Sequence, residues 1–184
     1  MIFPHLDVGT TTLRPIDPLD GAGVHRFLDR HGLAGAVSRD VLTELWASSP
    51  GEVAAQFEVA PRDGGPPAGL SGLHRLDLNG GHVQAGVFVD PAAGAETGAA
   101  AAALTVNYAF SGWSVRKVYL WTVEQAVGEL SGVSEIVRRE ATLRQFVHDR
   151  GELRDLNIFA VYREAWQSIG QDLLQRLSRP RTPC

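Results

Sequence analysis

Hydrophobic and polar residues alternate in four segments of the first half of the chain, a pattern typical of strands with one buried face. The expected strands are Thr10–Pro15, Ala54–Ala60, Ala68–Leu78 and His82–Val89. Capping residues between Asp17 and Asp20 predict a helix that runs to about His31, and a second helix is expected over Arg39–Trp46. The first half therefore predicts two helices beside an antiparallel meander.

The turn between the last two of these strands decides which way His74 points. Asn79-Gly80-Gly81 is a strong signal for a hairpin turn. With a two-residue turn, His74 pairs with Ala85 and lies on an apolar face. With a three-residue turn, it pairs with Gly86 and shares the face of Gln84, which makes a polar cluster. The sequence leaves both registers open.

The pattern changes from strand to helix after Val89, because Asp90-Pro91 ends the strand and an alanine-rich segment follows. The later elements are expected to be a helix over Thr97–Phe110, a strand over Val115–Val123, a helix over Val127–Arg139, a hairpin of strands Ala141–Asp149 and Glu152–Tyr162, and a helix over Ala165–Leu177. This order predicts a single α+β domain over residues 1–184, with a sheet of about seven strands and a flexible tail over residues 178–184.

Composition and charge narrow the class of protein. The 184 residues carry a net charge of -4, with 44% hydrophobic and 21% charged residues, which is ordinary for a globular domain and unlike a nucleic-acid-binding one. Cys184 is the only cysteine, so no intrachain disulfide is expected. Since no targeting pattern and no apolar run of ~20 residues occurs, we expect a cytoplasmic protein without nucleic-acid or membrane partners. The scattered histidines predict no metal site.

Several segments of the second half match one protein family in order and spacing. Thr97-Gly98-Ala99-Ala100 opens a helix of small residues directly after an apolar strand, and Tyr108-Ala109-Phe110 ends that helix. Arg138 to Arg144 and then Gly151 to Trp166 follow. In this order they resemble the GCN5-related N-acetyltransferases (GNATs), in particular the branch of ribosomal-protein N-terminal acetyltransferases. The resemblance implies the acyl-CoA N-acyltransferase fold, with a mixed and mostly antiparallel sheet flanked by helices.

The resemblance also implies a co-substrate, acetyl-CoA or another short acyl-CoA, and where it binds. Backbone groups of residues 87–89 (Val87, Phe88 and Val89) would hold the pantetheine and the acyl carbonyl. The N–H groups of residues 97–100 (Thr97, Gly98, Ala99 and Ala100) would hold the pyrophosphate, because a helix N-terminus is partly positive. Gln125 stands where the branch has asparagine, and Ala95 replaces the family's basic or amide residue.

Glu124 and His74 are the candidate catalytic bases. Glu124 follows the expected strand Val115–Val123, near where the family exposes the thioester, and burial there would raise the pKa of its carboxyl toward that of a general base. The alternative is a solvent-facing charge at a strand end. For His74 the alternative is a hydrogen-bonded structural residue. Trp121, on the same strand, is expected near the acyl group or the acceptor.

Together these features predict an acyl-CoA-dependent N-acetyltransferase that acts on the amine of a small metabolite or natural product. A protein N-terminus is the alternative acceptor. Because Ala95 and Glu96 depart from the family's phosphate-binding pattern, a relative that has lost or changed acetyl transfer is a third interpretation. The sequence does not identify the acceptor, and it leaves a homodimer open.

Overall fold

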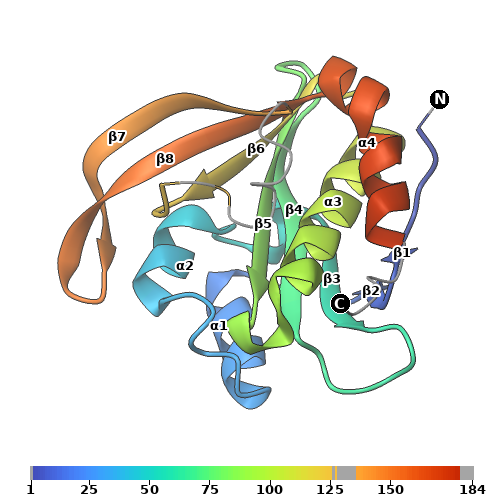
Figure 1. Cartoon of the computed structure of the whole chain (residues 1–184). Coiled ribbons are helices and arrows are strands. Elements are labelled where there is room, and N and C mark those ends of the chain that lie inside the picture. The colour runs from blue at the N-terminus through green and yellow to red at the C-terminus, as the bar shows by residue number, and fades with distance from the viewer. Residues whose placement is uncertain (1, 126, 128–135, 179–184) are drawn as a thin grey trace.

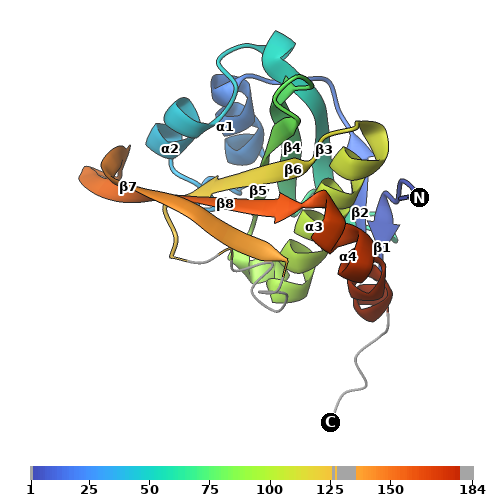
Figure 2. The same ribbon diagram turned by 90° about the horizontal axis from the view of Figure 1, so that it is seen from above.

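The structure, a computed structural model, describes residues 2–125, 127 and 136–178. These residues form one eight-stranded sheet in the order β1-β2-β3-β4-β5-β6-β8-β7, with helices on both of its faces (Figures 1 and 2). Within the described part of the chain, β5 and β6 are the one parallel pair, and all other neighbours are antiparallel. The expected α+β fold with a mixed, mostly antiparallel sheet is confirmed. The strand beyond the seven expected is β1, which has only two residues, Asp7–Val8, at the edge of the sheet. It is too short for a periodic pattern to reveal.

The first half follows the hydrophobic pattern closely. Its elements are β1 (Asp7–Val8), β2 (Thr11–Pro15), α1 (Gly21–Arg30), α2 (Arg39–Leu45), β3 (Val53–Pro61), β4 (Gly69–Asp77) and β5 (His82–Val89). Both helices have side-chain N-caps, which explains where they begin. The carboxylate of Asp20 accepts from the Gly23 N–H at 2.7 Å, and the hydroxyl of Ser38 accepts from the Val41 N–H at 3.3 Å.

The second half departs from the expectation at several element boundaries. Its elements are α3 (Ala95–Gly112), β6 (Lys117–Thr122), β7 (Val137–Asp149), β8 (Glu152–Tyr162) and α4 (Arg163–Ser178). α3 begins two residues before Thr97, because Gly94 takes φ +87° as the N-cap. The expected helix Val127–Arg139 lies mostly outside the described residues, and its end is wrong: Val137 pairs with Val161 in β7. The tail expected over 178–184 also lies outside the described residues, except Ser178, which ends α4.

Neither register expected for His74 occurs. Asp77 pairs with His82, as a two-residue turn requires, but a bulge follows and places His74 opposite Gln84. Arg75, at φ +51°, is the extra residue of the bulge. His74 therefore shares a face with Gln84 although the turn is the one that predicted an apolar face. A bulge depends on neighbouring strands, so the turn sequence alone did not predict it.

The two faces of the sheet have different cores. On one face, α3 and α4 cover a large cluster that includes Leu73, Val83, Val118 and the buried alanines of α3. On the other face, α1 and α2 cover a smaller cluster around Trp46 and Leu70. The small side chains of α3 let the helix lie close to the sheet, with Ala101 and Ala103 fully buried.

Trp46, directly after α2, packs against two glycines that face each other across β4 and β5. Gly72 pairs with Gly86, and a Cβ on either would meet the Trp46 ring, at 2.8 and 2.4 Å respectively. The indole is 1% exposed, and its N–H donates to the Leu19 carbonyl at 3.0 Å. The ring also packs against His74, with ring centroids 4.6 Å apart. The absence of a side chain at both glycines thus positions α2 on the sheet.

The hairpin of β7 and β8 extends as a long curved arm beside α2 (Figure 1). Its inner side contributes Val147 and Leu156 to a third cluster with Val41 and Leu45 of α2. At the base of the arm, Lys117 is joined to Glu140 by two contacts of 3.0 and 2.9 Å. The arm is therefore anchored at its base and packed along its length, which holds its tip over the region between α2 and β6.

Candidate functional site

A cavity of about 630 Å³ opens where the two parallel strands separate. Pairing of β5 with β6 ends at Ala85 and Leu120, although both strands continue, to Val89 and to Thr122. The cavity is lined by Ala102 of α3 on one side of the sheet and by Leu45 of α2 on the other. Because it touches both helical layers, the cavity passes through the sheet at the gap.

The free edge of β5 supplies backbone hydrogen-bond donors to this gap. The Asp90 N–H donates to the Ala68 carbonyl at 2.8 Å, so it points toward β4. Because the N–H direction alternates along a strand, the N–H of Phe88 also points toward β4, and those of Val87 and Val89 point to the edge that β6 has left. Val87 and Phe88 line the cavity, whereas Val89 lies beyond its lining. Val87 is thus the donor best placed to meet a carbonyl oxygen in the gap.

The four residues expected to bind phosphate open α3, just after β5 ends. Gly98 and Ala100 are buried, while Thr97 and Ala99 are half-buried. The Thr97 hydroxyl donates to the Ala93 carbonyl at 2.8 Å, and its N–H donates to the Gly94 carbonyl at 3.2 Å. Because α3 begins at Ala95, the N–H groups of residues 98–100 lie within the helix, and the first amides of the helix come before Thr97. None of the four lines the cavity, but Ala102 of the same helix does. The partly positive end of α3 is therefore near the gap, and not within it.

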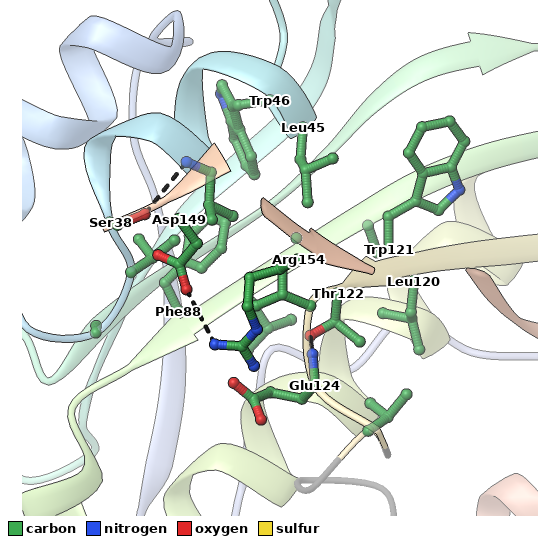
Figure 3. Close-up of a pocket in the computed structure, with 18 of the residues that line it drawn as sticks. Ser38, Leu45, Trp46, Phe88, Leu120, Trp121, Thr122, Glu124, Asp149 and Arg154 are labelled. Carbon is green, nitrogen blue, oxygen red and sulfur yellow. Dashed lines mark hydrogen bonds and ion pairs between the residues drawn. The ribbon is translucent and has the colours of Figure 1, made fainter. Parts of the chain in front are cut away.

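Glu124 and Gln125 follow β6 and both line the cavity as exposed residues, so the burial expected for Glu124 is wrong. The Glu124 N–H donates to the Thr122 hydroxyl at 3.1 Å, and its carbonyl accepts from the Asn157 amide at 2.9 Å. The backbone of Glu124 is thus held on both sides while its carboxylate is left for the cavity (Figure 3). The carbonyl of Gln125 accepts a hydrogen bond from the guanidinium of Arg139.

His74 forms part of the cavity wall and is only 1% exposed. Burial, followed by the nearby positive charge of Arg75, lowers the pKa of His74 to about 3. Its Nδ1 has no hydrogen-bond partner among the described residues. At neutral pH the ring is therefore uncharged and a weak base. Its contact with Trp46 favours a role in shaping the wall over the role of a general base.

Other lining residues were not candidates in the sequence. Ser38 and Trp46 come from the two ends of α2, and Asp149, Arg150 and Arg154 come from the tip of the β7–β8 arm (Figure 3). Arg154 donates to the Asp149 carboxylate at 3.5 Å. The only signal for the arm residues was the hairpin turn at Arg150-Gly151, which does not tell where the tip lies. Trp121 does line the cavity, as its place on β6 suggested.

Across residues 2–125, 127 and 136–178, no three His, Cys, Asp or Glu side chains gather to hold a metal ion. None of the helices that these residues form is long and apolar enough to cross a bilayer.

Similar solved structures identify the fold of this chain. No protein-family model matches the sequence, and no curated protein matches it. Among solved structures, a GCN5-related N-acetyltransferase from Brucella melitensis has a TM-score of 0.64 at 20% identity, covering 95% of this chain and 86% of that chain. RimJ from Mycobacterium smegmatis, in complex with CoA-disulfide, has a TM-score of 0.65 at 17% identity, covering 93% and 90%. Spermidine N-acetyltransferase from Vibrio cholerae, in complex with CoA and spermine, has a TM-score of 0.60 at 17% identity, covering 86% and 98%.

This chain therefore has the GNAT fold, as the resemblance implied. The matching structures include several kinds of N-acetyltransferase, so the likeness does not single out the ribosomal-protein branch.

Proposed function

We propose that this chain is an acyl-CoA-dependent N-acyltransferase that moves an acetyl or other short acyl group to the amine of a small metabolite. The observation that carries the proposal is the cavity that passes through the sheet between β5 and β6. An acyl thioester can enter from the α3 side and an amine from the α2 side, so that the two meet at the gap. Such a meeting of two substrates is what direct transfer in a ternary complex needs.

The residues present fit a CoA thioester. The free edge of β5 would receive the pantetheine, and the partly positive start of α3, beside residues 97–100, would receive the pyrophosphate. The acyl-CoA supplies the activated carbonyl. The N–H of Val87 would donate to the carbonyl oxygen as it gains charge during attack by the amine. No side chain is required for that step, so the departures at Ala95 and Glu96 affect affinity for the phosphates and not the chemistry.

Glu124 is the base that we propose for the incoming ammonium. It lines the cavity at the end of β6, and hydrogen bonds from and to its backbone hold its main chain there. His74 is the second candidate, but the pKa of about 3 makes it the weaker proton acceptor. A carboxylate can remove the proton directly or through one water molecule.

The test has two measurements on the purified full chain. Calorimetric titration with acetyl-CoA is expected to show binding, and no detectable binding at millimolar acetyl-CoA would reject the proposal. Mass spectrometry of reactions with acetyl-, propionyl- and malonyl-CoA is then expected to show N-acylation of small amines. Peptides with free N-termini form a second arm of the same experiment. If only the peptides are modified, the acceptor class is wrong and the acyltransferase assignment stands.

A further inference from the structure

Four charged residues line the cavity, and the two signs balance. They are the carboxylates of Glu124 and Asp149 and the guanidinium groups of Arg150 and Arg154. The pKa of His74, at about 3, means that this residue adds no charge at neutral pH. Three of the four charges come from the tip of the β7–β8 arm. The part of the cavity beneath the tip of the arm thus offers charges of both signs to a ligand.

Most of the N–H donors of Arg154 are not used by the described residues. A guanidinium has five N–H donors, and in the described part of the chain Arg154 has one polar partner, Asp149, at a long 3.5 Å. Its side chain is 40% exposed. Figure 3 shows its guanidinium reaching into the cavity between the carboxylates of Asp149 and Glu124. No ion pair joins it to Glu124 within the described residues, so most of its donors are left for a ligand.

The position of Arg154 is fixed by its neighbours. It pairs across the arm with Val147, which is 1% exposed and packs against α2. Its partner Asp149 pairs with Glu152 at the turn, and the Asp149 side chain is only 13% exposed. Because both strands of the arm are held there, the guanidinium is presented to the cavity from a rigid part of the fold.

We infer that the acceptor carries an anionic group as well as its amine, and that Arg154 binds the anion while the amine lies at Glu124. This inference rests on the proposed function. A planar guanidinium binds a carboxylate or a phosphate through two parallel hydrogen bonds, so either anion has the required chemistry. Val41, Leu45 and Trp121 add apolar side chains to the cavity lining and suit an apolar body. An apolar amino acid combines these features.

The same charges disfavour a polyamine acceptor. With one ammonium at Glu124, the second ammonium of a diamine would lie near Arg150 and Arg154. The one other carboxylate of the lining, Asp149, is only 13% exposed and already paired with Arg154. Like charges in a partly enclosed cavity repel more strongly than in water. The site therefore selects against dications by repulsion as well as for zwitterions by attraction.

The experiment compares acceptors that differ only in the anion. Steady-state kcat/KM is measured with acetyl-CoA for leucine, for isoamylamine, which lacks the carboxylate, and for the phosphonic analogue of leucine, with spermidine as the dication. The reported quantity is the ratio of kcat/KM for leucine to that for isoamylamine. Arg154→Gln is expected to lower this ratio about 10- to 100-fold, the loss of charge-assisted hydrogen bonds. Arg154→Lys keeps the positive charge but lacks the paired donors of the guanidinium, so its ratio is expected to lie between those of the wild type and Arg154→Gln.

Arg144→Gln is the matched control, because Arg144 is exposed on the same arm and does not line the cavity. Its ratio is expected to equal that of the wild type. The phosphonic analogue distinguishes a carboxylate site from a phosphate site. The acceptor whose kcat/KM falls more in Arg154→Gln carries the anion that the site prefers. A ratio that changes less than threefold in a folded Arg154→Gln, or preferred turnover of spermidine, overturns the inference and leaves the proposed function standing. If acetyl-CoA does not bind at all, both fall.

Discussion

Replacing Gly86 with alanine tests whether Trp46 lies against the gap between β5 and β6 as the structure shows. A Cβ at Gly86 would be 2.4 Å from the Trp46 ring atom Cζ3 and 3.0 Å from Cε3. Trp46 has little room to retreat, because its indole N–H is bonded to Leu19 and its own carbonyl accepts from Arg75 at 3.3 Å. The added methyl group must therefore push α2 away from the sheet or strain β5.

The change in unfolding free energy of Gly86→Ala follows from two opposing effects. Gly86 does not have a left-handed backbone, so alanine fits its conformation and would stabilise the fold by about 0.4–1 kcal/mol through the unfolded state alone. Overpacking costs about 1–3 kcal/mol. The clash wins, and we expect a net loss of about 1–2 kcal/mol. For a chain of this size that corresponds to a fall in Tm of about 2–8 °C.

Urea unfolding followed by tryptophan fluorescence measures the change, with Gly51→Ala as the control. A Cβ at Gly51 would meet only the Ser49 hydroxyl, at an ordinary 3.9 Å. That variant is expected to keep the wild-type stability within about 0.5 kcal/mol. A Gly86→Ala protein as stable as the wild type, or more stable, would refute the placement of Trp46. In the double variant with Trp46→Leu, the cost of Gly86→Ala is expected to disappear, since the clash is gone.

Three further predictions concern the site. Glu124→Gln is expected to lower kcat about 100-fold or more, a larger change than in KM, because it removes the proposed base. Gly98→Val is expected to weaken acetyl-CoA binding about tenfold or more in calorimetry while circular dichroism shows the helices intact, because a branched side chain blocks close approach to the start of α3. His74 has a folded-state pKa of about 3 against an unfolded value of 6.5. The wild type should therefore lose about 1.4 kcal/mol of unfolding free energy per pH unit as the pH falls from 6.5 toward 3, a slope that His74→Gln removes.

Each of these three predictions would be contradicted by a different result. Unaltered kcat in Glu124→Gln would make it a solvent-facing charge, and Glu44→Gln, on the outer surface of α2, is the control for charge alone. Unchanged acetyl-CoA affinity in Gly98→Val would remove the start of α3 as the phosphate site. An identical acid slope in wild type and His74→Gln would show that this histidine is accessible to protons in the folded state.

The sequence predicted most elements for reasons that are local. Alternation gave the limits of β4 and β5 within one or two residues, and Asp20 is the cap that begins α1. Local reasons also explain the errors. Val137 continues an apolar spacing that suits a helix, yet it pairs with Val161 in β7. The bulge at Arg75 shifted His74, because a bulge reflects pairing with two neighbouring strands.

The candidate site divides in the same way. Val87, Phe88, Glu124 and Gln125 line the cavity, and all four were expected as site residues from the resemblance to the GNATs. The ends of parallel neighbouring strands meet at the same edge of a sheet, which is the physical reason why they lie together. The residues of the arm could not be found in this way, because no local pattern tells how far a long hairpin bends.

By itself, the sequence determined most of the elements and the α+β class, because these depend on periodicity, capping and turn residues near one another in the chain. Its resemblance to the GNATs implied the mixed sheet and the strand residues beside the gap. Only the tertiary structure decided what faces that gap. The separation of β5 from β6 after Ala85, the seat of Trp46 on Gly72 and Gly86, and the return of Arg154 to the cavity all arise from packing between segments far apart in the chain. Such contacts depend on the shapes of several elements at once, and so no single segment encodes them.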